Sequence, residues 1–151
     1  MLFDEQTINL LKAVLKKNGH IDIPAQGTSM FPFIQEGNLC RFIVCEPQEL
    51  KKGEVVLFHL ETGQLTAHRY YGSKMMNNKS FFVFKGDTNL GFDQPVCEER
   101  IIGKLLYVQK EKSLLNVSDF RAFFWGKLIL LFPMLSSILR QYLNRKSNIL
   151  Y

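Results

Sequence analysis

The sequence predicts a mainly β fold with a short helix before it and an apolar helical segment after it. Three observations support this fold class. The 151 residues suit one domain with an appendage. Over residues 21–117, short apolar stretches alternate with turns rich in Gly, Asn and Asp, which is typical of a compact, coiled β fold. After Lys112 the strand pattern gives way to a Phe- and Leu-rich stretch.

Residues 1–20 have the pattern of an amphipathic helix. Its apolar positions recur at helical spacing, and Asn18-Gly19 is a typical signal for a helix C-terminus. The segment holds five charged residues and no long apolar run, so we do not expect a secretory signal there. The apolar face is predicted to consist of Ile8, Leu11, Val14 and Leu15.

Residues 21–117 form the predicted β domain. Turn signals such as Glu36-Gly37-Asn38 and Gly86-Asp87 separate its apolar stretches. The candidate strands are 39–45, 54–60, 65–71, 81–85 and 101–109.

Residues 118–151 form the predicted helical segment, with Ser118 as a candidate N-cap. Residues 122–139 are strongly apolar and contain a single lysine, Lys127, but Pro133 would kink a helix there. One interpretation is a helix that spans a membrane or lies at its interface, anchored through residues 120–140. The other is a helical pair folded back on the β domain.

Charge and cysteine content narrow the function classes. The net charge is +5, but no basic cluster alternates with aromatic residues, so we expect no nucleic-acid partner. A basic surface facing anionic lipid is the simpler interpretation. Cys40, Cys45 and Cys97 are odd in number and lack metal-site spacing, so we expect reduced thiols, no zinc and no other cofactor.

A serine on a glycine-preceded turn is the first candidate for chemistry. Ser29 lies in Gly27-Thr28-Ser29-Met30-Phe31-Pro32, where Gly27 permits an unusual backbone and Met30 can be buried beside the serine. A free serine hydroxyl is a weak nucleophile and needs an adjacent base.

Two further pieces supply a base and an acid. His68 lies in the second strand of a predicted hairpin, and Asp87 and Asp93 follow the strand at 81–85. Ser, His and Asp on turns and strands of a β domain match the roles of nucleophile, general base and orienting acid. Each residue alone would more often be structural.

Together these pieces resemble the type I signal peptidases and the wider LexA-like peptidase clan. The matching segments, within residues 24–107, are GTSMFPFIQEGN, KKGEVVLFHL, the pair His68-Arg69 and FKGDTNLGFDQPV. The resemblance implies a LexA/signal-peptidase-like coiled β fold. A histidine at position 68 is similar to the Ser-His-Asp type of the endoplasmic reticulum and archaea, and implies that Asp93 orients His68, with Asp87 as the alternative.

The sequence departs from that family in two ways. Signal peptidases usually carry a serine two residues before the nucleophile, whereas this chain has Gly27. The implied oxyanion donors are then the Ser29 amide and the Thr28 hydroxyl. The usual N-terminal membrane anchor is also missing, so we expect a membrane-associated protein whose catalytic domain is cytoplasmic, with the extracytoplasmic face as the alternative.

The expected function is that of a serine endopeptidase that cleaves a signal or leader peptide from a precursor, after small residues as the resemblance implies. Two alternatives remain open. One is a LexA-like self-cleaving regulator, although residues 1–20 are too short for a helix-turn-helix domain. The other is a catalytically silent peptide-binding module.

Overall fold

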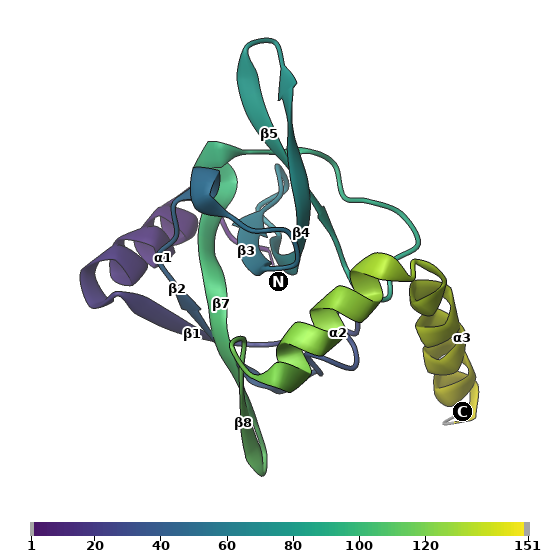
Figure 1. Cartoon of the computed structure of the whole chain (residues 1–151). Helices are drawn as coiled ribbons and strands as arrows, with labels where there is room; N and C mark the ends of the chain where they lie inside the picture. The colour runs from purple at the N-terminus through teal and green to yellow at the C-terminus, as the bar shows by residue number, and fades with distance from the viewer. Residues whose placement is uncertain (1, 150–151) are drawn as a thin grey trace.

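The computed structural model describes residues 2–149 and has a mixed α/β fold (Figure 1). One antiparallel sheet curls into a half-barrel, with a helix at its N-terminal end and two helices after it. The predicted β domain flanked by helices is confirmed at this level. The class is mixed α/β because three helices accompany the sheet, whereas the sequence predicted a mainly β class. Residues 150–151 of the predicted C-terminal segment lie outside the described residues.

The strand order in the sheet is β1-β2-β7-β3-β4-β5-β6, and β8 pairs with β7. Five strands match the predicted ones, while β1, β6 and β8 were not predicted. The helices and strands are α1 (Glu5–Asn18), β1 (His20–Pro24), β2 (Leu39–Ile43), β3 (Val55–His59), β4 (Leu65–Met76), β5 (Lys79–Lys85), β6 (Val96–Cys97), β7 (Ile101–Lys110), β8 (Ser113–Asn116), α2 (Phe120–Leu131) and α3 (Met134–Ile149).

Helix α1 begins and ends where local chemistry dictates. The Asp4 side chain accepts a hydrogen bond from the Thr7 amide at 2.8 Å, as an N-cap does. At the other end, Gly19 adopts a left-handed φ of 77° and donates its N–H to the Leu15 carbonyl. Ile8 and Leu15 are buried, so the predicted apolar face is the one that packs.

Strand alternation divides the core into two clusters. Val55 and Leu57 of β3 belong to one cluster, and Val56 and Phe58 belong to the other, because successive side chains of a strand point to opposite faces. In the second cluster Phe58 stacks on Phe84 with ring centroids 4.5 Å apart. Strands β3 and β4 therefore have packed side chains on both faces, which fixes the position of every residue along them.

The C-terminal helices pack on the half-barrel through one side only. The N-cap of α2 is Asp119 and not Ser118, so the helix begins one residue later than predicted. Ala122, Gly126 and Ile129 of α2 are buried, whereas Phe123 and Phe124 between them are exposed. The segment is thus a helical pair folded back on the β domain, as the second interpretation had it, yet it keeps an apolar outer side.

Among residues 2–149, no single helix is both long and apolar enough to cross a membrane. Helices α2 and α3 meet that criterion only when taken together, and the chain bends by 104° between them. Pro133 lies at this bend, where it prevents α2 from continuing.

The inner side of α2 should contribute measurably to stability. We expect Ile129→Ala to lower the free energy of unfolding by about 2–5 kcal/mol, because Ile129 is only 1% exposed and its loss leaves a cavity. Leu131→Ala on the same helix is the matched control. Leu131 is 70% exposed, so its loss should cost about 0.5 kcal/mol or less. Urea denaturation followed by circular dichroism measures both, and equal effects would contradict the packing described.

Candidate active site

Ser29 lies on the long loop between β1 and β2. Gly27 has a φ of +75°, a left-handed conformation that residues with a side chain rarely adopt. Met30, directly after the serine, is 3% exposed and belongs to the core cluster around β2 and β7. The local sequence thus anchors the loop on both sides of Ser29 and leaves its hydroxyl beside a cavity.

His68 is held in the middle of β4, opposite Val56 of β3. The residue is 6% exposed, and its ring meets Phe58 edge-on at a centroid distance of 6.2 Å. This packing restricts the imidazole to a narrow range of orientations.

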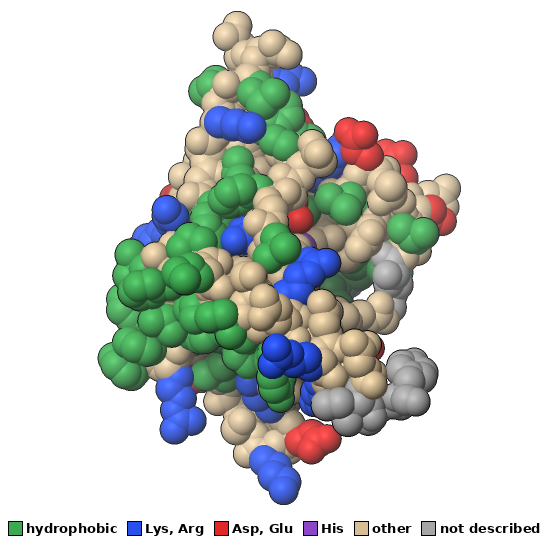
Figure 2. All heavy atoms as spheres, turned by 90° about the vertical axis from the view of Figure 1, so that its right-hand side faces the viewer, with side chains coloured by type: hydrophobic (Ala, Val, Ile, Leu, Met, Phe, Trp, Pro, Cys, Tyr) green, Lys and Arg blue, Asp and Glu red, His purple; other side chains and the backbone are tan. Residues whose placement is uncertain are grey.

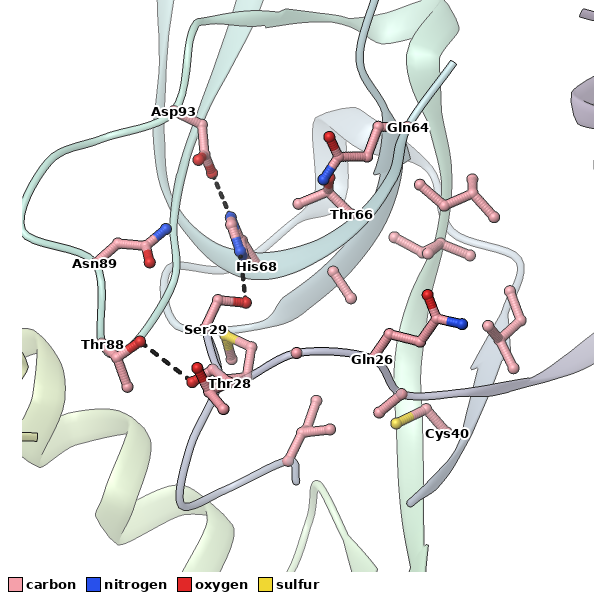
Figure 3. A pocket seen from close by; sticks show the side chains of 18 of the residues that line it. Gln26, Thr28, Ser29, Cys40, Gln64, Thr66, His68, Thr88, Asn89 and Asp93 are labelled. Atoms are coloured by element: carbon pink, nitrogen blue, oxygen red, sulfur yellow. Dashed lines mark hydrogen bonds and ion pairs between the residues drawn. The ribbon is translucent and has the colours of Figure 1, made fainter. Parts of the chain in front are cut away.

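The loop after β5 brings the acid to the histidine. Asp93 Oδ2 lies 2.6 Å from His68 Nδ1, and His68 Nε2 lies 3.0 Å from Ser29 Oγ (Figure 3). An ionised carboxylate only accepts hydrogen bonds, so Nδ1 carries the proton and Nε2 is free to accept one from the serine hydroxyl. The three side chains form an unbroken hydrogen-bonded chain that can draw a proton from Ser29.

A glycine allows this loop to approach the serine closely. A Cβ atom built on Gly86 would lie 2.8 Å from the Ser29 carbonyl oxygen, so any side chain there would force the two loops apart. The Thr88 amide donates to the same carbonyl at 2.9 Å, and the Thr88 hydroxyl donates to the Thr28 carbonyl at 3.2 Å. These contacts fix Asp93 and Ser29 relative to each other.

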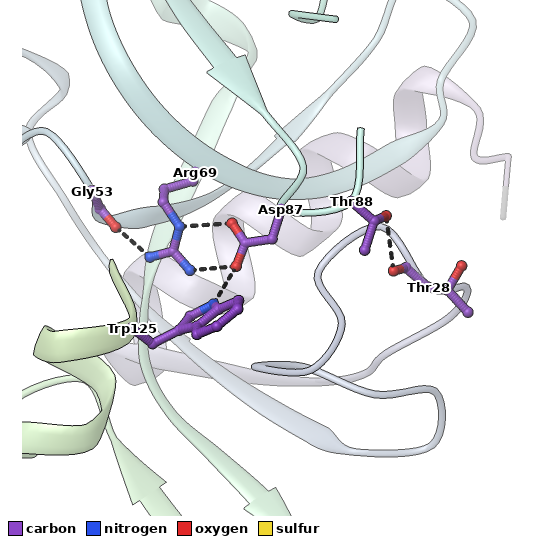
Figure 4. A network of polar contacts seen from close by, with 6 residues as sticks. All are labelled: Thr28, Gly53, Arg69, Asp87, Thr88 and Trp125. Carbon is purple, nitrogen blue, oxygen red and sulfur yellow. Dashed lines mark hydrogen bonds and ion pairs between the residues drawn. The ribbon is translucent and has the colours of Figure 1, made fainter. Parts of the chain in front are cut away.

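Asp87 has a different partner from Asp93. Its two carboxylate oxygens accept hydrogen bonds from Nε and Nη2 of Arg69, at 2.8 and 2.7 Å (Figure 4). Trp125 of α2 donates its indole N–H to Asp87 at 2.8 Å, and Arg69 also donates to the Gly53 carbonyl. Asp87 is 1% exposed and Arg69 is 2% exposed. The structure therefore places Asp93, and not Asp87, against His68.

The amide of Ser29 is a candidate anion-binding donor. Its own carbonyl is occupied by Thr88, but no acceptor for the Ser29 N–H lies within hydrogen-bond distance among residues 2–149. Thr28 also borders the cavity, although no hydrogen bond donated by its hydroxyl group is found within the described residues. When a carbonyl carbon is bound to Ser29 Oγ, a negative charge develops on its oxygen, and the free Ser29 N–H can stabilise that charge.

A cavity of about 600 Å³ opens beside the three side chains (Figure 3). Apolar side chains from β1, β2, β3 and β4 form its floor, and α3 closes one side. Cys40 is the other nucleophilic side chain that lines it, but burial raises the pKa of this thiol to about 12, so it stays protonated and unreactive. The apolar lining residues include Ile23, Met30, Ile34, Phe42, Leu57, Leu65 and Ala67.

Several residues at the site escaped the sequence reasoning. Thr88 follows Asp87 directly and is typical of a turn, so its two bonds to the serine loop gave no separate signal. Trp125 lay inside an apolar stretch that was interpreted as a whole. Arg140 and Asn144 of α3 line the cavity, yet their sequence position beyond the apolar stretch suggested only a charged flank.

Comparison with protein-family models, with curated protein sequences and with solved structures found no match for this chain. Within the described residues, no three His, Cys, Asp or Glu side chains are grouped so that they could hold a metal ion.

The two aspartates should differ in what they stabilise. We expect Asp87→Asn to lower the free energy of unfolding by about 3–5 kcal/mol, because it leaves the buried Arg69 charge without its counter-charge. Asp93→Asn is the matched control on the same loop. The Asp93 side chain is 18% exposed and hydrogen-bonds the His68 ring, so about 1 kcal/mol is expected. Urea unfolding of the two variants tests this order, and a larger loss for Asp93→Asn would contradict it.

Proposed function

We propose that this chain is a serine endopeptidase that cleaves a signal or leader peptide from a precursor protein. Ser29 is the nucleophile, His68 the general base and Asp93 the acid that orients His68. One observation carries the proposal: the Asp93–His68–Ser29 hydrogen-bonded chain, with distances of 2.6 and 3.0 Å, at the edge of an apolar cavity.

In the proposed reaction, each of the described groups has its own role. Ser29 Oγ attacks the scissile carbonyl carbon while its proton passes to His68 Nε2. The carbonyl oxygen becomes an oxyanion, which the Ser29 amide and the Thr28 hydroxyl stabilise. Asp93 stabilises the imidazolium, which then gives its proton to the leaving amine. Water, deprotonated by His68, hydrolyses the acyl-enzyme and restores Ser29.

The finer fold assignment belongs to the same proposal. Three features support it: a serine on the loop between β1 and β2, a histidine-arginine pair in a hairpin strand and a Gly-Asp turn. We place the half-barrel in the LexA/signal-peptidase-like group on these grounds. Cleavage after small residues is what the resemblance implies, and the apolar floor favours uncharged side chains.

The two alternatives make different demands on the site. A self-cleaving regulator needs a segment of its own chain at Ser29. In the part of the chain that the structure describes, Phe3 is the residue of the N-terminal segment 2–20 that lines the cavity, and its amide donates to the Gly63 carbonyl. A silent binding module needs no base within hydrogen-bond distance of a serine hydroxyl. The placement of His68 Nε2 at 3.0 Å from Ser29 Oγ therefore favours the enzyme.

Loss of either end of the proton path should abolish turnover. We expect Ser29→Ala and His68→Ala each to lower the rate of peptide hydrolysis by about 10³-fold or more, without unfolding the protein. Hydrolysis of a pooled peptide library, read by mass spectrometry, and labelling by a fluorophosphonate probe measure the effect. Ser73→Ala and His20→Ala, at exposed positions, are the matched controls. Undiminished turnover by folded Ser29→Ala protein would refute the proposal.

The orienting acid should act on the rate far more than on stability. We expect Asp93→Asn to lower kcat by about 10⁴-fold, because an asparagine in place of the carboxylate favours the wrong imidazole tautomer and does not stabilise the imidazolium. Asp87→Asn, assayed at a temperature and urea concentration where it is still folded, should keep a larger share of kcat. If the folded Asp87→Asn protein were the less active of the two, their roles would have to be exchanged.

A further inference from the structure

The outer side of the α2–α3 pair is an exposed apolar area. Figure 2 shows hydrophobic side chains gathered on one half of this face, with Lys and Arg side chains around them. We name this area the outer apolar face. Its members are Phe120, Phe123, Phe124, Leu131, Phe132, Met134 and Ile138, and each is at least 52% exposed. A patch of this size on a soluble protein usually marks an interaction site.

The distribution of side chains on α2 is the reverse of that in an ordinary surface helix. Ala122 and Gly126, both small, point into the protein, whereas Phe123 and Phe124 point away from it. An amphipathic helix of a soluble domain normally turns its large apolar residues inward and polar residues outward. One side of α2 packs on the half-barrel. The other side is also apolar and is exposed to a partner outside the molecule.

The charges around the outer apolar face indicate what lies outside. Residues 118–149 carry five basic side chains and one acidic one, Asp119. The Asp119 carboxylate accepts a hydrogen bond from the Asn116 amide and lies at the start of α2. Lys127 lies over the Phe123 ring, with its ammonium 5.5 Å from the centroid, so a cation borders the exposed aromatic residues directly. Aromatic residues beside Lys and Arg suit the headgroup level of an anionic bilayer.

The way the helices are mounted favours a helix pair that lies flat on the membrane. Spanning would require lipid on every side of α2, but Ile129 is 1% exposed in the protein core. In α3, Ser136 is 1% exposed and accepts a hydrogen bond from Lys85, and Tyr142 stacks on Phe31. Both helices thus keep one side on the protein, which leaves only the outer side for lipid.

The outer apolar face adjoins the candidate active site. Arg140, Leu143 and Asn144 of α3 line the same cavity as Ser29. Leu90 and Phe92, 63% and 60% exposed, lie on the loop that carries Asp93, so this loop also exposes apolar side chains. A surface that covers the outer apolar face would therefore meet the rim of the cavity.

We propose that the outer apolar face docks flat on an anionic lipid bilayer and holds the cavity beside Ser29 at the headgroup level. The inference rests on the proposed peptidase function for its meaning: the substrates would be precursors whose cleavage site lies at a membrane surface. The docking itself depends only on the helix pair, so it can be tested apart from catalysis.

Vesicle flotation tests the docking. Full-length protein is mixed with vesicles of phosphatidylcholine alone or with about 30 mol% phosphatidylglycerol, and the fraction that floats is measured. We expect binding to the anionic vesicles, and Phe123→Gln/Phe124→Gln should lower the partition coefficient at least about tenfold, since two exposed aromatic side chains no longer enter lipid. Lys127→Gln should weaken binding to anionic vesicles and leave the weaker binding to neutral ones unchanged.

Leu10→Gln/Met75→Gln is the matched control, because both residues are exposed and apolar but lie on α1 and β4. It should float like the unchanged protein. Failure of the unchanged protein to float with anionic vesicles would overturn the proposal. So would a dimer in sedimentation velocity that Phe123→Gln/Phe124→Gln dissociates, because the outer apolar face would then cover a second copy.

Hydrolysis of soluble peptides by the same samples separates this inference from the proposed function. The Phe123→Gln/Phe124→Gln protein should hydrolyse soluble peptides at the unchanged rate, because neither side chain lines the cavity. Flotation without hydrolysis would leave the docking standing and refute the peptidase. Hydrolysis without flotation would do the reverse.

Discussion

The buried ion pair between Arg69 and Asp87 is the interaction on which the rest of the structure depends. Both residues are almost fully buried, and removing two charges from water is costly unless their hydrogen-bonding groups are satisfied. Here the guanidinium meets both carboxylate oxygens and the Gly53 carbonyl, and the indole of Trp125 completes the set. The pair thereby joins β4, the turn before β3, the loop after β5 and α2 (Figure 4). Any of these that moved would leave a buried polar group without one of its hydrogen-bond partners.

The candidate active site uses the opposite face of the same strand. His68 and Arg69 are neighbours in β4, so their side chains point to opposite faces of the sheet. One face holds the structural ion pair, and the other points His68 into the cavity. The loop repeats this division: Asp87 turns to Arg69 and Asp93, six residues later, turns to His68. The rigid Arg69–Asp87 ion pair lies next to the Asp93–His68–Ser29 hydrogen-bonded chain. This arrangement explains how the two loops hold Ser29 and Asp93 in place.

Much of the fold and of the candidate site could be predicted from local sequence signals. The turns around Gly63 and Gly86 separate apolar stretches, and they place Ser29, His68 and Asp93 on loops and strands of a β domain. The choice between Asp93 and Asp87 could not be made from the residues alone. It depends on Trp125, which lies 38 residues beyond Asp87 and whose contact with it no spacing rule predicts. Strand β6 was missed because two residues are too few to show alternation.

Two separate requirements explain the composition of α2. A Cβ on Gly126 would lie 3.3 Å from Nη1 of Arg69, so the close approach that lets Trp125 reach Asp87 requires small residues on the inner side. This packing requirement does not constrain the outer side of α2, where polar residues would have been equally compatible with it. Phe123 and Phe124 therefore need a reason outside the ion pair. The proposed lipid surface would supply one, because it would make exposed aromatic side chains favourable at the place where the cavity opens. Helix α2 would then connect the proposed lipid-binding surface to the ion pair that holds the loop of Asp93.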